Sequence, residues 1–189
     1  MNWKTLNSKL IYKNSWLKLR EDKIIHPDGK PGIYSVVDIA PGVFTIAITK
    51  KSEIYLIKQL RYTTNINSWE LPGGGQEKGE SFLKTAKREL MEEAGLKAKR
   101  WHHIGMCQPL NGSSSQIDQI FVAKNLSPTK NKFKKREGIG KIKKFSVPQI
   151  IEMIKNEKIT DGQAIAHITK ALLYLNYKFD PDGIISTRK

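Results

Sequence analysis

Five of the eighteen acidic residues of this chain fall within a stretch of seventeen residues, just after a run of three glycines. They are Glu77, Glu80, Glu89, Glu92 and Glu93. Apolar side chains recur at four-residue spacing over residues 81–93, which predicts an amphipathic helix that Gly95 ends. Three glutamates then stand at i, i+3 and i+4, so their carboxylates share one face of that helix. Like charges at this spacing repel, so this face requires a cation.

The composition of the cluster indicates which cation it suits. Carboxylates without histidine or cysteine are typical of a site for Mg²⁺ or Mn²⁺ rather than zinc. Glycines 73–75 let the main chain approach a ligand closely, and Arg88 can hold carboxylates in a bidentate fork. A cation held there can bridge phosphate oxygens and lower the pKa of a bound water. The segment therefore predicts metal-assisted cleavage of a phosphoanhydride; the alternative is a solvated, charged surface helix.

The spacing of these residues resembles the box of the Nudix hydrolases. Gly74, five residues, Glu80, seven residues, Arg88-Glu89-Leu90, one residue, Glu92-Glu93, one residue and Gly95-Leu96 reproduce the whole box. The resemblance implies an α/β fold, a Nudix α/β/α sandwich with a mixed β-sheet. It implies that Glu89, Glu92 and Glu93 bind Mg²⁺ together with the Gly73 carbonyl, that Mn²⁺ can substitute, and that Glu80 supports this shell. Glu92 and Glu93 are expected to be catalytic.

Segments on both sides of the box resemble the ADP-ribose pyrophosphatase branch, which acts on nucleoside diphosphate sugars. They are residues 59–62 (QLRY), 69–72 (WELP) and 158–163 (KITDGQ), with the strand-rich amino-terminal stretch. In that branch the amino-terminal strands help form a homodimer, and both subunits line the nucleotide pocket. The resemblance implies that Arg61 contacts the substrate phosphates; the alternative is a surface arginine at a strand end. The other predicted substrate-binding residues are Trp69, Glu70, Gly74 and Gln116.

Two positions depart from that branch. Residues 109–116 read PLNGSSSQ, with Gln116 where the branch often has a glutamate, so the choice of substrate stays open. The branch also commonly takes a catalytic glutamate from a late loop, and Glu137 is the only acid between residues 131 and 144. Glu137 is therefore the candidate base. Its alternative role is a solvated partner for the neighbouring lysines.

The remaining pattern predicts an amino-terminal β subdomain over residues 1–41 and a Nudix hydrolase domain over residues 42–189. The first is expected to hold short antiparallel strands that make dimer and substrate contacts. In the second, residues 43–49 and 54–59 are expected as buried neighbouring strands, with further strands over 101–106 and 117–123. Ser146 and Pro148 predict the start of a helix through residue 155, and a last amphipathic helix is expected over 162–177.

Nearly half of the net charge of +15 comes from residues 130–144, which hold eight basic residues against one acid and are expected to form a loop. Because Phe133 is its only aromatic residue, this run lacks the stacking platform of single-strand nucleic-acid binding proteins. It is expected to be solvated or to attract a phosphate-rich substrate, and nucleic acid is not favoured as a partner. The single cysteine, Cys107, favours a reducing compartment. We expect a cytoplasmic protein with neither signal peptide nor membrane span.

Together these features predict Mg²⁺-dependent hydrolysis of the pyrophosphate bond of ADP-ribose or a related nucleoside diphosphate sugar, giving NMP and a sugar phosphate. One alternative is a Nudix hydrolase of nucleoside triphosphates, dinucleoside polyphosphates or capped RNA ends. Another is a non-catalytic nucleotide-binding module. The products distinguish the two enzymes, because triphosphates release pyrophosphate.

Overall fold

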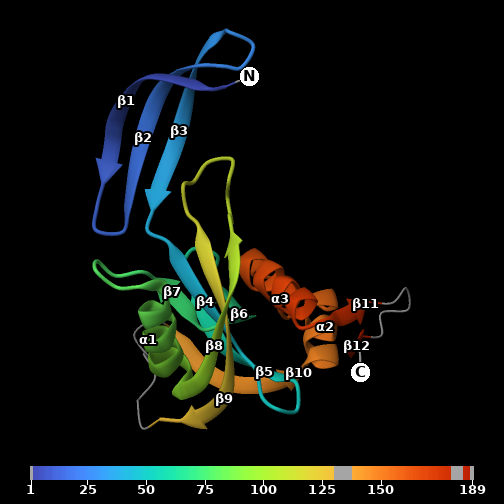
Figure 1. The fold of residues 1–189 in the computed structure, drawn as a ribbon. Helices are drawn as coiled ribbons and strands as arrows, with labels where there is room; N and C mark the ends of the chain where they lie inside the picture. The colour runs from blue at the N-terminus through green and yellow to red at the C-terminus, as the bar shows by residue number, and fades with distance from the viewer. Residues whose placement is uncertain (1, 130–137, 180–184, 188–189) are drawn as a thin grey trace. The chain divides into compact units, whose positions relative to one another are not determined.

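The computed structural model describes residues 2–129, 138–179 and 185–187. The chain divides into two compact units (Figure 1). The first comprises Met1–Pro41 with Gln108–Ile117, and the second comprises Gly42–Cys107 with Asp118–Lys189. The loop that was expected to influence substrate choice, residues 109–116, therefore belongs to the same unit as the amino-terminal segment.

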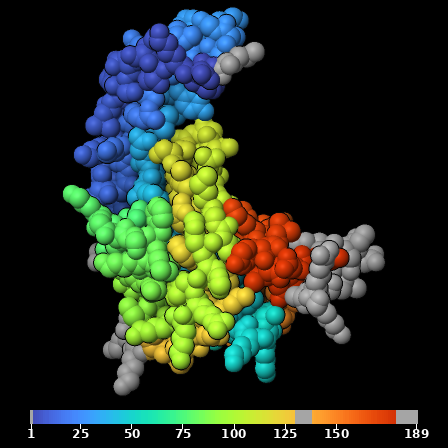
Figure 2. Space-filling model, viewed as in Figure 1, coloured from blue at the N-terminus to red at the C-terminus, as the bar shows by residue number. Residues whose placement is uncertain are grey.

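Three antiparallel strands in the order β1–β2–β3 form the first unit: β1 (Lys4–Lys13), β2 (Leu17–Ile25) and β3 (Pro31–Ile39). Asn14 shapes the first turn, because its side-chain Oδ1 accepts a hydrogen bond from the backbone N–H of Trp16 at 2.8 Å. β1 is an edge strand, and all of its residues are exposed (dark blue in Figure 2). The other edge, β3, is joined to the loop, because Val37 exchanges backbone hydrogen bonds with Ser113 and Ser115.

Two sheets form the centre of the second unit. The mixed sheet has the order β7–β4–β9–β8 and contains β4 (Gly42–Ala47), β7 (Gly73–Gly75), β8 (Leu96–Cys107) and β9 (Asp118–Pro128). β4 runs parallel to β9, and the other pairings in this sheet are antiparallel. The second sheet is antiparallel in the order β10–β5–β6, formed by β5 (Glu53–Arg61), β6 (Ile66–Glu70) and β10 (Ile139–Ser146). Two short strands, β11 (Tyr177–Phe179) and β12 (Ile185–Thr187), pair with each other.

Helices cover both faces of the mixed sheet: α1 (Phe82–Ala94) on one face, α2 (Val147–Lys155) and α3 (Gly162–Tyr174) on the other. The alternation of side chains along β4 explains these layers. Phe44 and Ile46 belong to the apolar cluster with α2 and α3, whereas Val43 and Ala47 belong to clusters with α1. The predicted α/β/α sandwich with a mixed sheet and a separate amino-terminal antiparallel sheet is confirmed.

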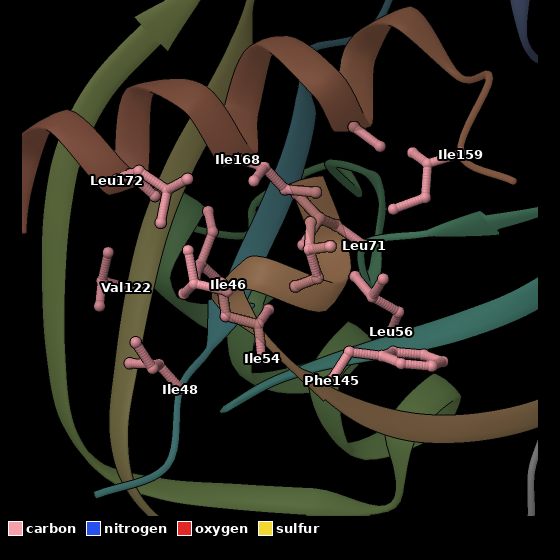
Figure 3. Close-up of a cluster of buried hydrophobic side chains, with 14 of the residues drawn as sticks. Ile46, Ile48, Ile54, Leu56, Leu71, Val122, Phe145, Ile159, Ile168 and Leu172 are labelled. Atoms are coloured by element: carbon pink, nitrogen blue, oxygen red, sulfur yellow. The ribbon is translucent and has the colours of Figure 1, made fainter. Parts of the chain in front are cut away.

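The main core lies between the sheets and helices α2 and α3 (Figure 3). Ile46, Leu56 and Ile168 come from three different elements and are 0% exposed. Burying a side chain of this kind stabilises a fold by roughly 1.5–3 kcal/mol. This core fixes β4 and β5, the strands that lead to the site described below.

The basic run was expected as a loop, and this expectation is wrong for its second part. Residues 139–144 belong to β10, which pairs with β5. Ile139 and Phe145 are buried whereas Lys141 and Lys143 are exposed, so the strand is half buried and its lysines obscure the apolar pattern. Residues 130–137 lie outside the described residues.

Two further expectations need correction. The apolar runs over residues 43–49 and 54–59 form β4 and β5, but these strands belong to different sheets and meet at an isolated bridge between Ile48 and Ile54. The last helix ends at Tyr174 rather than at residue 177, because Asn176 adopts a positive φ of 61° and Tyr177 begins β11. In the described part of the chain, no helix has the length and apolar character needed to cross a membrane.

Candidate active site

Helix α1 carries the predicted carboxylates on one face. Its start is fixed by Ser81, whose side chain accepts a hydrogen bond from the Lys84 N–H at 3.3 Å. Its end is fixed by Gly95 in the left-handed conformation, with φ of 62°. Between these caps, Ala86 and Leu90 are 0% exposed and anchor the helix on the sheet. The register of α1, and with it the direction of its glutamates, is therefore fixed at both ends and along its buried face.

The glycine strand β7 lies against two of these glutamates. Gly73 donates its backbone N–H to Glu93 Oε2 at 2.7 Å. A Cβ atom at position 74 would lie 2.5 Å from Glu89 Oε1, so Gly74 leaves the space that this carboxylate fills. Glu89 and Glu93 are 5% and 3% exposed. Buried carboxylates are costly unless they are paired, so the face needs positive charge or N–H donors.

Arg88 supplies positive charge to this face. Its Nη1 donates hydrogen bonds to Glu89 Oε1 at 2.5 Å and to Glu92 Oε2 at 3.4 Å. Its Nη2 donates to Glu80 Oε2 at 3.1 Å and to the Gly75 carbonyl at 3.2 Å. Burial lowers the pKa of Arg88, but the hydrogen bond to Glu80 and the charge of Glu89 outweigh it and raise the pKa above its ordinary value. Arg88 is therefore a permanent cation that holds three carboxylates together.

Glu80 joins the cluster from the turn before α1. Its side chain is 6% exposed and accepts hydrogen bonds from Arg88 and from Thr85 Oγ1, the latter at 3.0 Å. The hydrogen bond from Arg88 lowers the pKa of Glu80, and the Thr85 hydroxyl adds to this effect against the opposing effect of burial. Glu80 therefore stays ionised and orients Arg88.

The donors on this face fit a hard divalent cation. Their side chains are carboxylates, and the main chain of a glycine strand lies next to them. Among the described residues, no three acidic, histidine or cysteine side chains already stand together as a metal site. Arg88 donates to one carboxylate oxygen of Glu89 and to one of Glu92.

A pocket of about 780 Å³ opens beside the glycine strand. Its lining includes Gly73, Gly74 and Glu93, and it also includes Gln59 and Arg61 from β5. Gln59 and Arg61 are two residues apart on a strand, so they share one face of it. The volume is in the range of small-molecule sites. The fold thus brings the predicted arginine to the same pocket as one of the helix carboxylates.

Arg61 is held by a buried carboxylate. Its Nε donates to both oxygens of Glu70 at 3.1 Å, and its Nη2 donates to Oε2 at 2.5 Å. The Glu70 side chain is 4% exposed and that of Arg61 is 48% exposed. Burial lowers the pKa of Arg61, but Glu70, together with the charges of Asp161 and Glu93, raises it overall. Among the described residues Nη1 has no hydrogen-bond partner, so this end of the fork is available to an anion.

The other three predicted site residues are Trp69, Gln116 and Glu137. The side chain of Trp69 lies on the opposite face of β6 from that of its neighbour Glu70. It packs edge-on against Phe145, with ring centroids 4.9 Å apart, and lines a different pocket. Gln116 belongs to the first unit. Glu137, the predicted base, lies outside the described residues. Their roles in binding or catalysis stay predictions.

Several polar residues of this region were not predicted from the sequence as site residues. Gln59 is 7% exposed and lines the pocket; its position two residues before Arg61 was an available signal. A buried polar network at the base of α3 was also not predicted from the sequence. Asp118 Oδ2 accepts a hydrogen bond from Gln163 Nε2 at 3.0 Å and lies 3.3 Å from His167 Nε2. Asp118 and His167 are 0% exposed. No local pattern joins β9 to α3, so only the fold reveals this group.

Comparisons with known proteins agree with this architecture. Two family models match the chain: the NUDIX domain over residues 38–168, and the nucleoside diphosphate sugar hydrolase N-terminal domain over residues 3–37. The methanol dehydrogenase activator of Bacillus methanolicus is 28% identical over 164 residues, which are 86% of this chain and 88% of that protein. An ADP-ribose pyrophosphatase of Bacillus subtilis (strain 168) is 27% identical over 176 residues, or 93% of each chain.

A solved structure shares the fold. The crystal structure of an ADP compounds hydrolase superposes with a TM-score of 0.81, covering 93% of this chain and 95% of that one. The sequences are 16% identical, so this likeness concerns the fold alone.

Proposed function

The chain belongs to the NUDIX family and is a pyrophosphohydrolase, and we propose that its substrate is ADP-ribose or a related nucleoside diphosphate sugar. The products are then a nucleoside monophosphate and a sugar phosphate. The match of residues 3–37 to the nucleoside diphosphate sugar hydrolase N-terminal domain supports this substrate class. The similarity to an ADP-ribose pyrophosphatase along nearly the whole chain supports it as well.

One observation carries the proposal: Glu93, fixed by the Gly73 N–H, lines the same pocket as Arg61, fixed by Glu70. A pyrophosphate needs positive charge on its oxygens and a site that can activate water next to it. Arg61 provides the first of these, and the carboxylate face of α1 is suited to hold the ion that provides the second. The alternative, a solvated and charged surface helix, does not explain why one of its glutamates lines a pocket together with an arginine.

NUDIX hydrolases generally use divalent metal ions, and the ion proposed here is Mg²⁺, with Mn²⁺ able to substitute. When bound, the ion neutralises phosphate charge and lowers the pKa of a bound water. Glu89, Glu92 and Glu93 would hold it, together with the Gly73 carbonyl. Arg88 holds the carboxylates of Glu89 and Glu92 close together before the ion arrives.

The remaining steps belong to residues of the chain. Arg61 binds the pyrophosphate through Nη1, while Glu70 holds the rest of the fork. Water attacks one phosphorus, its oxygen forms the new P–O bond, and the bond from that phosphorus to the bridging oxygen breaks. Glu137 is proposed to position this water and to accept its proton.

The assembly is proposed to be a homodimer formed with the help of the amino-terminal strands. The exposed edge strand β1 offers backbone hydrogen-bonding groups and apolar side chains for such a contact. The proposed location is the cytoplasm, because a chain with one cysteine has no disulfide of its own to maintain.

The test is release of nucleoside monophosphate from ADP-ribose, other nucleotide sugars, dinucleoside polyphosphates and triphosphates, with and without Mg²⁺. The expected result is preferential, Mg²⁺-dependent conversion of ADP-ribose or a relative into AMP and ribose 5-phosphate. Pyrophosphate release from triphosphates as the main reaction would instead assign the chain to another Nudix activity. Binding without Mg²⁺-dependent turnover would identify a non-catalytic module.

Two variants connect the reaction to the proposed residues. Glu93→Gln retains an oxygen that can accept the Gly73 N–H but removes the charge, so turnover should fall by at least about a hundredfold while the fold persists. The control is Glu157→Gln, the same chemical change at an exposed residue just after α2. Equal rates in the wild type and in Glu93→Gln would refute the assignment of the site.

A further inference from the structure

A second polar pocket, with a volume of about 440 Å³, shares Arg61 with the pocket described above. Its lining comes from the residues that join β5 to β6, from β6 itself, and from the segment that enters α3. Hydroxyl, carboxylate and amide groups dominate: Ser68, Glu70, Thr160, Asp161 and Gln163 contribute to it. No aromatic residue is found among the described residues that line it, so it lacks a surface on which a base could stack.

The polar groups of this pocket are held in place by the fold. Asp161 caps α3, because its Oδ2 accepts a hydrogen bond from the Ala164 N–H at 2.8 Å. Gln163 donates through Nε2 to the fully buried Asp118 at 3.0 Å. The Thr160 N–H donates to Ser68 Oγ at 3.4 Å, which ties the segment before α3 to β6. Side chains fixed in this way bind a ligand with little loss of conformational entropy.

The charges of the pocket do not favour a phosphate. Two carboxylates, Glu70 and Asp161, line it against one cation, Arg61, and two nitrogens of that cation already bind Glu70. A phosphate placed there would meet the Asp161 carboxylate as a like charge. A neutral polyol is suited to it, because its hydroxyl groups donate to carboxylates and to amide oxygens in charge-assisted or ordinary hydrogen bonds.

We propose that this pocket receives the sugar of the nucleoside diphosphate sugar, and that Asp161 and Gln163 determine which sugar is accepted. The inference rests on the proposed function, since it places the substrate across Arg61. The pyrophosphate then lies in the larger pocket, beside Gly73 and Glu93, and the sugar hydroxyls face the start of α3. Asp118 acts as a positioning residue, through its hydrogen bond with Gln163.

The experiment compares two ligands that differ by the sugar: ADP-ribose and ADP. Calorimetric titration of the full chain in EDTA measures both affinities without turnover. In the wild type, ADP-ribose should bind more tightly than ADP. Asp161→Asn, which keeps a good helix cap, and Gln163→Ala should each weaken ADP-ribose by about tenfold and change ADP by less than about twofold. Glu157→Gln, at an exposed residue just after α2, should change neither affinity.

Three results overturn the inference: no difference between the two ligands in the wild type, an unchanged difference in both variants, or an equal loss for both ligands. Unaltered ADP binding also shows that a variant is folded. The proposed function is measured separately, by AMP release with Mg²⁺. If the chain releases no AMP but its preference for ADP-ribose over ADP depends on Asp161, the proposed reaction is refuted and the sugar pocket is supported.

Discussion

Arg88 shows how a single residue can make a crowded anionic face stable. Its side chain is 17% exposed and contacts the carboxylates of Glu80, Glu89 and Glu92. In water such an ion pair contributes little, but removing one partner of a buried pair leaves an uncompensated charge that costs about 3–5 kcal/mol. The arginine of the box is therefore a structural cation as well as a neighbour of the proposed metal ligands.

Replacing Arg88 with Met should lower the thermal unfolding temperature more in EDTA than in Mg²⁺. The substitution keeps much of the side-chain volume but leaves the carboxylates without their cation, and a bound ion restores part of the lost charge. We expect a drop of several degrees in EDTA, on the scale of about 2–4 °C per kcal/mol for a chain of this size. A drop of the same size in both buffers would show that the ion does not replace the arginine's charge.

The lowered pKa of Glu80 predicts a dependence of stability on pH. Its folded pKa lies below the ordinary value because of the hydrogen bond from Arg88. The stabilisation is therefore fully present above the ordinary glutamate pKa of about 4.3 and is lost as the pH falls through the lower folded value.

Thermal unfolding of the wild type and of Glu80→Gln, followed from neutral to acid pH, measures this contribution. The difference between the two proteins should be largest near neutrality and should shrink below about pH 4. A difference that stays constant over this range would show that packing, rather than the charge of Glu80, accounts for the effect of the substitution.

At the scale of elements, the β5–β6 hairpin positions Arg61, the arginine proposed to bind the substrate phosphates. Arg61 is at the end of β5 and Glu70 at the end of β6, and Glu70 is almost completely buried. A bidentate carboxylate sets the plane of a guanidinium, which leaves Nη1 in a defined place. The hairpin thus fixes the orientation of the half-exposed Arg61 side chain, so that its Nη1 donates in a defined direction.

Glu70→Gln should therefore raise KM for the nucleotide sugar by about tenfold and affect kcat less, because the amide binds one side of the fork more weakly. Steady-state kinetics measures the two constants. Glu53→Gln is the matched control, since it removes the partner of Lys144 in another ion pair of β5, outside the lining of the pocket. An unchanged KM in Glu70→Gln would mean that Arg61 needs no support to bind the substrate.

At the scale of the whole molecule, the exposed edge of the amino-terminal sheet predicts association. Leu10 and Tyr12 of β1 are each 55% exposed, and apolar residues on an open edge strand are an aggregation hazard unless a partner covers them. We therefore expect sedimentation analysis to give twice the 21.5 kDa of the chain. Leu10→Lys should weaken this association, and a monomeric wild type at micromolar concentration would contradict the expectation.

The sequence by itself determined the elements whose signals are local. Helix α1, its end at Gly95 and the shared face of its glutamates follow from the 3.6-residue period and from local conformational preferences. The mixed α/β architecture followed from the order of strands and helices, with the resemblance to the Nudix family. These features need no knowledge of which distant segments meet.

The tertiary structure decided every feature that depends on contacts between distant segments. The strand assignment of residues 139–144 depends on pairing with β5, and the placement of Trp69 away from Glu93 depends on which face of β6 is covered. The pairing of Arg61 with Glu70 and the link from Gln163 to Asp118 also join separate elements. Strand partners are selected by burial and hydrogen bonding across the whole fold, so a local pattern carries no record of them.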